Sequence, residues 1–222
     1  MKDFNKMSDK EKILYLLCSN HSGKMSGMVS VSTSVLENPH CQKRRACAGT
    51  ICEKCYAGAQ LQRYASQAKK LKLATEFFTS HVIDYDEIPL LNTLYFRFEA
   101  FGDLINSIQV VNYFNIARKN KAMNCALWTK NPWVVSYAMS EYGIEKPDNL
   151  VILISSPYIN KKIDIDKIKS VYPFIDKVFT VYSNEYIDNN CMDINCGARE
   201  CFTCLKCYSK INGNVYINER LK

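Results

Sequence analysis

Long apolar runs are missing from this 222-residue sequence, and none approaches the roughly 18 residues that a membrane-spanning helix needs. The first 20 residues also lack a secretory pattern. Their apolar stretch, residues 13–18, is short and flanked by charges, so it is typical of one face of an amphipathic helix. We therefore expect no membrane partner and a cytoplasmic location.

Glycine-rich phosphate-binding motifs are also absent. The sequence has 8 glycines and contains no Gly-x-Gly-x-x-Gly segment. Residues 22–24 read Ser-Gly-Lys, but the earlier glycine of a phosphate loop is missing and Met25 occupies the position that requires serine or threonine. Both motifs for nucleotide binding are therefore excluded.

The charge balance is only mildly basic. The 29 lysines and arginines exceed the 22 aspartates and glutamates by 7, and 47% of the residues are hydrophobic. This composition is typical of one folded domain with solvated lysines. Nucleic acid is a weakly supported partner, and the basic helix surface that would contact it carries Arg63, Lys69, Lys70 and Lys72.

Cysteine is unusually frequent, whereas histidine occurs only 3 times. Eleven cysteines do not fit a disulfide framework, because the cytoplasm is reducing and the number is odd. We interpret Cys18 and Cys125 as core residues. The other nine form two metal-binding runs: Cys41, Cys47, Cys52 and Cys55, and then Cys191, Cys196, Cys201, Cys204 and Cys207.

The spacing of the second run favours iron over zinc. Structural zinc usually takes two Cys-x2-Cys pairs separated by a long spacer. Cys201, Cys204 and Cys207 instead follow one another at x2 gaps, as in bacterial ferredoxins. We therefore predict one or two [4Fe-4S] clusters, with Cys191, Cys196 or a cysteine of the first run as a further ligand. A zinc site and free thiols are the alternatives. His40 adjoins Cys41 and could be a ligand, although a lone histidine beside a cysteine is more often a bystander.

Strands and helices alternate along the chain. This order predicts a parallel sheet, open or curled into a partial (β/α) barrel. The expected strands are 28–34, 93–100, 124–129, 149–155 and 177–182, with a short tail strand at 214–218. The expected helices are 8–19, opened by a capping box, and 57–80, 104–119, 132–142 and 164–170.

We expect one iron–sulfur α/β domain over residues 1–222. It comprises an N-terminal helical segment (1–27), the partial barrel (28–190) and a cysteine-rich C-terminal extension (191–222). In such sheets, function lies on loops at the carboxyl ends of the strands. Both cysteine runs leave strands at that rim, so we predict that they meet there.

Four polar residues are candidates for holding a cofactor or small molecule at the rim. Arg97 and Glu99 share a strand face by the period of two and are predicted to form a buried pair in the barrel mouth, with Asp103 nearby. Lys130 shares a face with Trp128 and is predicted to line a ligand pocket. Structural salt bridges and core packing are the alternatives.

Several segments between about residues 20 and 210 resemble a phage family labelled gene product 88. The resemblance implies a phage or mobile-element origin and a host-cytoplasm location, and it implies no particular reaction or redox partner. The matching segments are 22–25, 30–34, 38–41, 52–57, 102–103, 129–131 and the final cysteines.

The layout also resembles radical S-adenosylmethionine enzymes, which place a cysteine loop after the first strand of a partial barrel. Residues 98–103 resemble their acidic, glycine-containing motif, and residues 191–207 resemble their auxiliary-cluster extensions. This resemblance implies S-adenosylmethionine as a cofactor. The first run departs from their Cys-x3-Cys-x2-Cys spacing, and its four cysteines would fill a cluster if Cys41 were a ligand. We therefore place electron transfer first.

Overall fold

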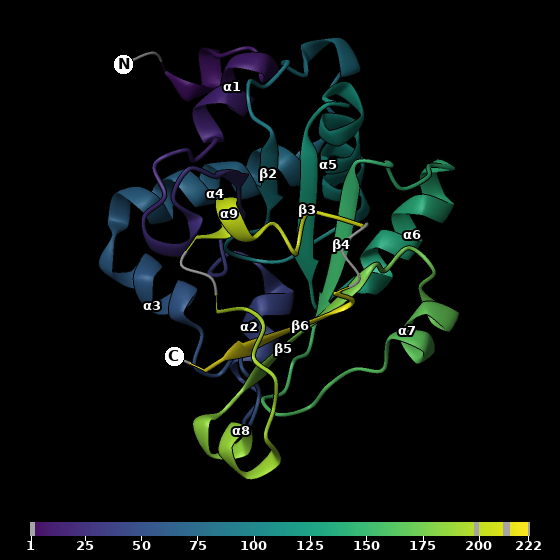
Figure 1. Cartoon of the computed structure of the whole chain (residues 1–222). Coiled ribbons are helices and arrows are strands. Elements are labelled where there is room, and N and C mark those ends of the chain that lie inside the picture. Colours follow the sequence, from purple (N-terminus) through teal and green to yellow (C-terminus); the bar gives the residue numbers. More distant parts are fainter. Residues whose placement is uncertain (1–2, 198–199, 211–213, 222) are drawn as a thin grey trace.

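The computed structural model describes residues 3–197, 200–210 and 214–221, and it is built around one parallel sheet (Figure 1). The strands pair in sequential order, and the sheet does not close on itself, so the predicted α/β partial barrel is confirmed. The strands are β1 (Val29–Val31), β2 (Tyr95–Phe98), β3 (Asn124–Thr129), β4 (Leu150–Ser155), β5 (Lys177–Tyr182) and β6 (Tyr216–Arg220).

The α-helices connect or flank these strands. They are α1 (Asp9–Leu16), α2 (Pro39–Arg45), α3 (Tyr56–Arg63), α4 (Ala65–Ser80), α5 (Ser107–Lys119), α6 (Pro132–Tyr142), α7 (Ile165–Val171), α8 (Asn184–Asn190) and α9 (Cys201–Cys204). Three short 3₁₀ helices are η1 (Phe4–Lys6), η2 (Gly23–Met25) and η3 (Tyr85–Glu87).

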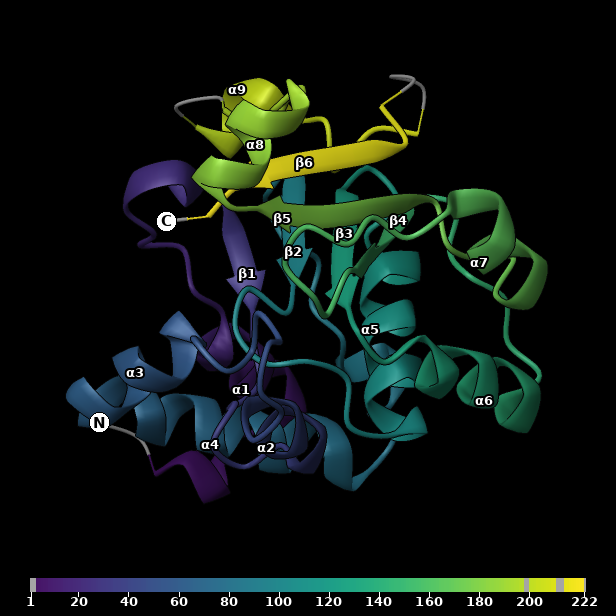
Figure 2. The same ribbon diagram turned by 90° about the horizontal axis from the view of Figure 1, so that it is seen from below.

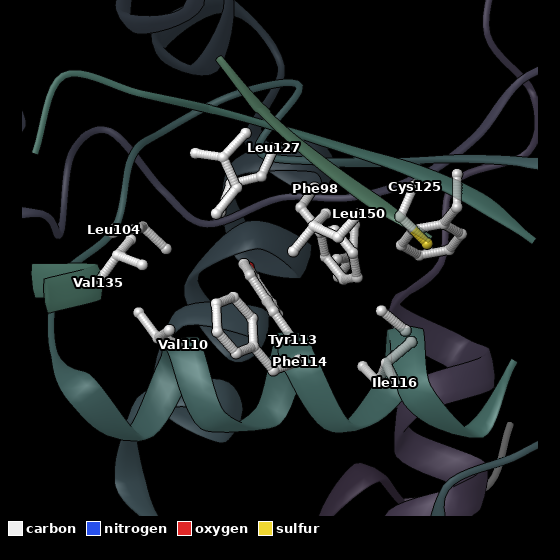
Figure 3. Close-up of a cluster of buried hydrophobic side chains, with 14 of the residues drawn as sticks. Phe98, Leu104, Val110, Tyr113, Phe114, Ile116, Cys125, Leu127, Val135 and Leu150 are labelled. Atoms are coloured by element: carbon white, nitrogen blue, oxygen red, sulfur yellow. The ribbon is translucent and has the colours of Figure 1, made fainter. Parts of the chain in front are cut away.

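Helices α1, α4, α5, α6 and α7 all contribute side chains to one core on the same face of the sheet. A sequential parallel order produces this arrangement, because each crossover advances to the next strand on the same side. Figure 3 shows Phe98, Leu127 and Leu150 of the strands facing Tyr113 and Phe114 of α5. We call this the outer face of the sheet.

The opposite, inner face is covered by the C-terminal segment. Side chains that alternate with the core residues along the strands, including Ala126, Val151 and Leu153, pack with Tyr208 in a second apolar cluster. Figures 1 and 2 show α9 on the opposite side of the sheet from α5. The extension after residue 190 is thus an integral layer of the fold, and it also supplies β6.

Several elements have the predicted bounds, namely β3, β5 and α6, and the capping box of Ser8 and Glu11 is formed. The predicted helix over residues 57–80 is wrong as a single element, because it breaks at Tyr64 into α3 and α4. Helix α2 was not predicted, although Asn38 caps it and Pro39 opens it. The tail strand lies two residues later than expected.

Among the helices that the structure describes, none combines the length and the apolar character that crossing a membrane would demand.

Gly102 provides a test of the packing at the carboxyl end of β2. It adopts a φ of +80°, and an added Cβ would lie 2.5 Å from Thr33 Oγ1 and 2.6 Å from the Thr33 carbonyl oxygen. We expect Gly102→Ala to lower the free energy of unfolding by roughly 3 kcal/mol, because left-handed strain adds to overpacking. Urea unfolding measures this.

The matched control is Gly143→Ala. Gly143 also has a positive φ, of +59°, but an added Cβ would meet nothing within 4 Å. Its replacement should therefore cost only about 1 kcal/mol, the conformational part alone. An equal loss of unfolding free energy in the two variants would contradict the close packing of Thr33 against Gly102.

Candidate functional site

Asp103 joins three loops at the carboxyl-terminal rim of the sheet. Its carboxylate accepts hydrogen bonds from Thr129 Oγ1 (2.6 Å), from the Leu104 amide and from the Lys130 amide (2.9 Å). Its carbonyl oxygen accepts a hydrogen bond from Asn38 Nδ2 at 2.7 Å. The loops after β1, β2 and β3 are therefore held to one carboxylate and one carbonyl group.

Glu99 forms a second buried junction directly after β2. Its carboxylate accepts hydrogen bonds from the Thr33 amide and hydroxyl, from Gln109 Nε2 and from the Tyr113 hydroxyl, the last at 2.5 Å. The residue is 2% exposed and has a φ of +56°, which is strained for a side chain other than glycine. Burial raises the pKa of Glu99 to about 8, although the hydrogen bonds oppose this.

The predicted pairing of Arg97 with Glu99 in the barrel mouth is therefore wrong. The positive φ of Glu99 interrupts the alternation of the strand, so its carboxylate turns to Gln109 and Tyr113 of α5. Arg97 stays on the inner face, where its guanidinium lies 3.9 Å from the centre of the Trp128 ring and Nη1 donates to Met25 Sδ.

Three cysteines of the first run gather beside the rim junction. Burial raises the pKa of Cys41, and the charges of Asp103, Glu99, Cys52 and Cys55 raise it further. Burial also raises the pKa of Cys52, where Cys55 adds to the effect. We call Cys41, Cys52 and Cys55 the rim group.

Cys47 lies apart from the rim group. It is exposed, and its thiol is directed at the carbonyl oxygen of Lys43, 3.3 Å away. The rest of this loop crosses the rim, because the Ile51 amide donates to the carbonyl oxygen of Pro157 after β4. The structure thus gathers three of the four predicted ligands of the first run.

Four cysteines of the second run gather over the inner face of the sheet. Burial raises the pKa of Cys207 to about 12, and the charges of Cys196, Cys201 and Cys204 contribute to the increase. Cys191 lies apart, exposed at the C-terminal end of α8. We call Cys196, Cys201, Cys204 and Cys207 the inner group.

Two cations accompany the inner group. Lys24 Nζ donates to the Cys196 carbonyl oxygen at 3.1 Å, to Cys196 Sγ at 3.7 Å and to Glu219 at 2.7 Å. The charge of Arg97 lowers the pKa of Cys201 and Cys207, against the effect of burial. Arg97 Nε is buried and has no hydrogen-bond partner within the described part of the chain.

The prediction that both cysteine runs meet at one rim needs correction. Three cysteines of the inner group, Cys196, Cys201 and Cys207, pack with the inner-face cluster. Cys41 and Cys55 instead pack with Val35 and α3 in a separate cluster. The reason is the parallel pairing of β6 with β5. The chain leaves β5 at the rim and must cross the inner face to enter β6 from the other end.

The four predicted cofactor-binding residues are thus divided. Asp103 and Lys130 lie by the rim group, since both influence the pKa of Cys52. Arg97 lies by the inner group, and Glu99 lies between the sheet and α5. Sequence reasoning missed Lys24, which lies 172 positions before Cys196 and gives no local signal, and Thr33, which lies in a serine-rich segment.

All eleven cysteines are free thiols. Within the ranges that the structure describes, no three His, Cys, Asp or Glu side chains are arranged to hold one metal ion. Thiolates that share one zinc ion lie about 3.8 Å apart, because each Zn–S bond is about 2.3 Å long. The two groups are therefore gatherings of thiols and not single-ion sites in this conformation.

The raised pKa of Glu99 predicts a pH-dependent stability. The pKa of Glu99 is about 8 in the folded protein, against an ordinary value of 4.5. At any pH between 4.5 and 8, the folded protein therefore binds more protons at this group than the unfolded chain does. Stability from this group is therefore present at low pH and lost as pH rises from about 4.5 to 8, by up to about 1.4 kcal/mol per pH unit. Asp103 and Tyr113 are the titratable groups that face it.

Glu99→Gln should remove this dependence, because the amide does not titrate. Urea unfolding of both proteins at pH 5, 6.5 and 8 measures the difference. The stability of the variant relative to the unsubstituted protein should rise with pH. Parallel curves would show that Glu99 titrates normally in the folded protein.

Comparison with known proteins gives one family assignment. No curated protein and no solved structure matches this chain. The model of the family described as gene product 88 matches residues 8–215. That match includes the rim junction and both cysteine groups, and it covers most of the 222 residues. The chain belongs to the gene product 88 family.

Proposed function

We propose that this protein binds two [4Fe-4S] clusters, one at the rim group and one at the inner group, and acts in electron transfer. The observation that carries the proposal is the gathering of thiols within each group. Burial raises the pKa of Cys41 and of Cys207, and the charges of neighbouring cysteines add to both increases. Thiols must lose their protons to bind a metal. Thiolates placed this close repel one another unless a shared cation compensates them.

Iron–sulfur clusters suit these groups better than zinc. The successive x2 gaps of Cys201, Cys204 and Cys207 favour this conclusion.

Nearby cations support the proposal, because a cluster with cysteine ligands carries negative charge. Lys24 and Arg97 accompany the inner group, and Lys130 and Arg44 lower the pKa of Cys52 in the rim group against the effect of burial. Hydrogen bonds and positive charge near cluster sulfur raise the reduction potential. The surroundings are those expected of a redox centre.

The proximity of the two groups supports electron transfer between them. Arg97 adjoins the inner group, and the loop from Glu99 to Asp103 adjoins the rim group. Arg97 and Glu99 are two positions apart in the sequence, a step of about 7 Å along a strand. Two clusters would therefore lie on either side of the end of β2.

A radical S-adenosylmethionine-type reaction is the second candidate, and one observation favours it. The rim group contains three cysteines, since Cys47 is exposed and directed elsewhere. Three thiolates leave one iron of a [4Fe-4S] cluster without a cysteine ligand, which is what binding of that cofactor requires. The acidic loop 99–103 lies beside this group.

The two cysteine groups predict which cysteine-to-serine substitutions will cause loss of bound iron. Anaerobically reconstituted protein should bind about eight iron and eight sulfide per chain. Cys204→Ser and Cys52→Ser should each lose about half of both, with a matching loss of broad visible absorption. Iron, sulfide and zinc analysis with an absorption spectrum measures this.

Cys47→Ser and Cys191→Ser are the matched controls from the same two runs. Both thiols are exposed and lie outside the groups, so both variants should retain all of the iron. Iron loss in the controls equal to that in the group variants would contradict the assignment. A colourless protein that contains zinc would contradict the proposed function itself and favour the zinc-stabilised nucleic-acid module.

Addition of S-adenosylmethionine separates the two candidate functions. We expect an unchanged cluster spectrum and no 5'-deoxyadenosine after reduction, because electron transfer requires no free iron position. A shifted electron paramagnetic resonance spectrum, together with 5'-deoxyadenosine in the product mixture, would favour the radical enzyme.

A further inference from the structure

The imidazole of His40 is held beside the rim group. The Asn38 side chain accepts hydrogen bonds from the His40 amide at 2.9 Å and from the Cys41 amide at 3.2 Å, and its own amide donates to the Asp103 carbonyl oxygen. One side chain therefore positions His40 and Cys41 together against the rim junction.

His40 carries an unused ligand atom. Its Nε2 is buried and has no hydrogen-bond partner among the residues that the structure describes. Buried polar atoms in folded proteins nearly always have a partner, so an unpartnered nitrogen calls for an explanation such as a ligand. Imidazole nitrogen is a common ligand of iron when the ring is neutral.

The surroundings of His40 are those of the rim group. Asp103, Arg44 and Lys130 act electrostatically on His40 and also on Cys52. The two side chains thus face the same charged groups, although they come from opposite ends of the first cysteine run.

The other candidate for a fourth ligand is Cys47, and the structure disfavours it. Its thiol is exposed and lies 3.3 Å from the carbonyl oxygen of Lys43. The rim group therefore offers three thiols from the first run and one unpartnered imidazole nitrogen.

We propose that Nε2 of His40 is the fourth ligand of the cluster at the rim group, with Cys41, Cys52 and Cys55 as the other three. This inference rests on the proposed cluster binding and specifies the ligands of one centre. A neutral imidazole in place of a thiolate leaves the cluster less negative, so its reduction potential is higher than that of an all-cysteine cluster.

The test compares the full-length protein with His40→Cys and Cys47→Ser after anaerobic reconstitution. Each protein is labelled with ¹⁵N-histidine and reduced, and pulsed electron paramagnetic resonance detects nitrogen bonded to iron. We expect a strong histidine nitrogen coupling in the unsubstituted protein and in Cys47→Ser. His40→Cys should lose the coupling, retain its iron and show a lower reduction potential for one cluster.

His40→Cys supplies a replacement ligand, so loss of the coupling is not a consequence of losing the cluster. Iron-loaded protein without histidine coupling, or coupling that survives in His40→Cys, would overturn the ligand assignment and leave the proposed function intact. Loss of cluster iron in Cys47→Ser would do the same by making Cys47 the fourth ligand. Unsubstituted protein that retains neither iron nor sulfide would overturn the proposed function as well.

Discussion

A sheet of sequential parallel strands has to cover its inner face, and this requirement shapes the rest of the molecule. The helices of the crossovers pack on the outer face, and β1 does not pair with β6 to close a barrel. The inner face carries apolar side chains whose exposure to water would be costly. The C-terminal segment meets the requirement by placing Tyr208 and three of the inner-group cysteines against that face. The residues that complete the fold are therefore also the proposed ligands. If the proposed clusters bind, their binding and the closure of the inner layer would stabilise one another.

The polar rim has a comparable double role. Asp103 and Glu99 are buried carboxylates, and hydrogen-bond donors from the loops after β1 and β3 and from α5 satisfy them. Neither carboxylate is directed at open space, so both act as junctions that fix the loop carrying Cys41. Burial raises the pKa of the Cys41 thiol, and the neighbouring acidic groups raise it further. Under the proposed function, this thiol would lose its proton only on binding the cluster. This environment disfavours reaction of a free thiolate at Cys41.

The sequence predicts the elements whose signals are local. Strands β3 and β5 and helix α6 follow from runs of alternating or apolar residues and from Pro132. The orientation of Glu99 could not be predicted, because the period of two assumes extended backbone and φ at Glu99 is +56°. The position of the second cysteine run also depended on a long-range fact, the pairing of β6 with β5. Spacing indicated which cysteines are candidates, but only the fold separates Cys196 from Cys191 and Cys52 from Cys47.

The two proposed ligand sets imply a direction for electron flow. Four thiolates would surround the inner cluster, whereas three thiolates and one imidazole would surround the rim cluster. Lys24 and Arg97 would raise the potential of the proposed inner cluster, but they would act from outside the coordination shell. A ligand exchange changes the charge in direct contact with iron, so we expect its effect to be the larger one. The rim cluster would then be the better acceptor, and electrons would pass from the inner cluster, across the end of β2, to the rim.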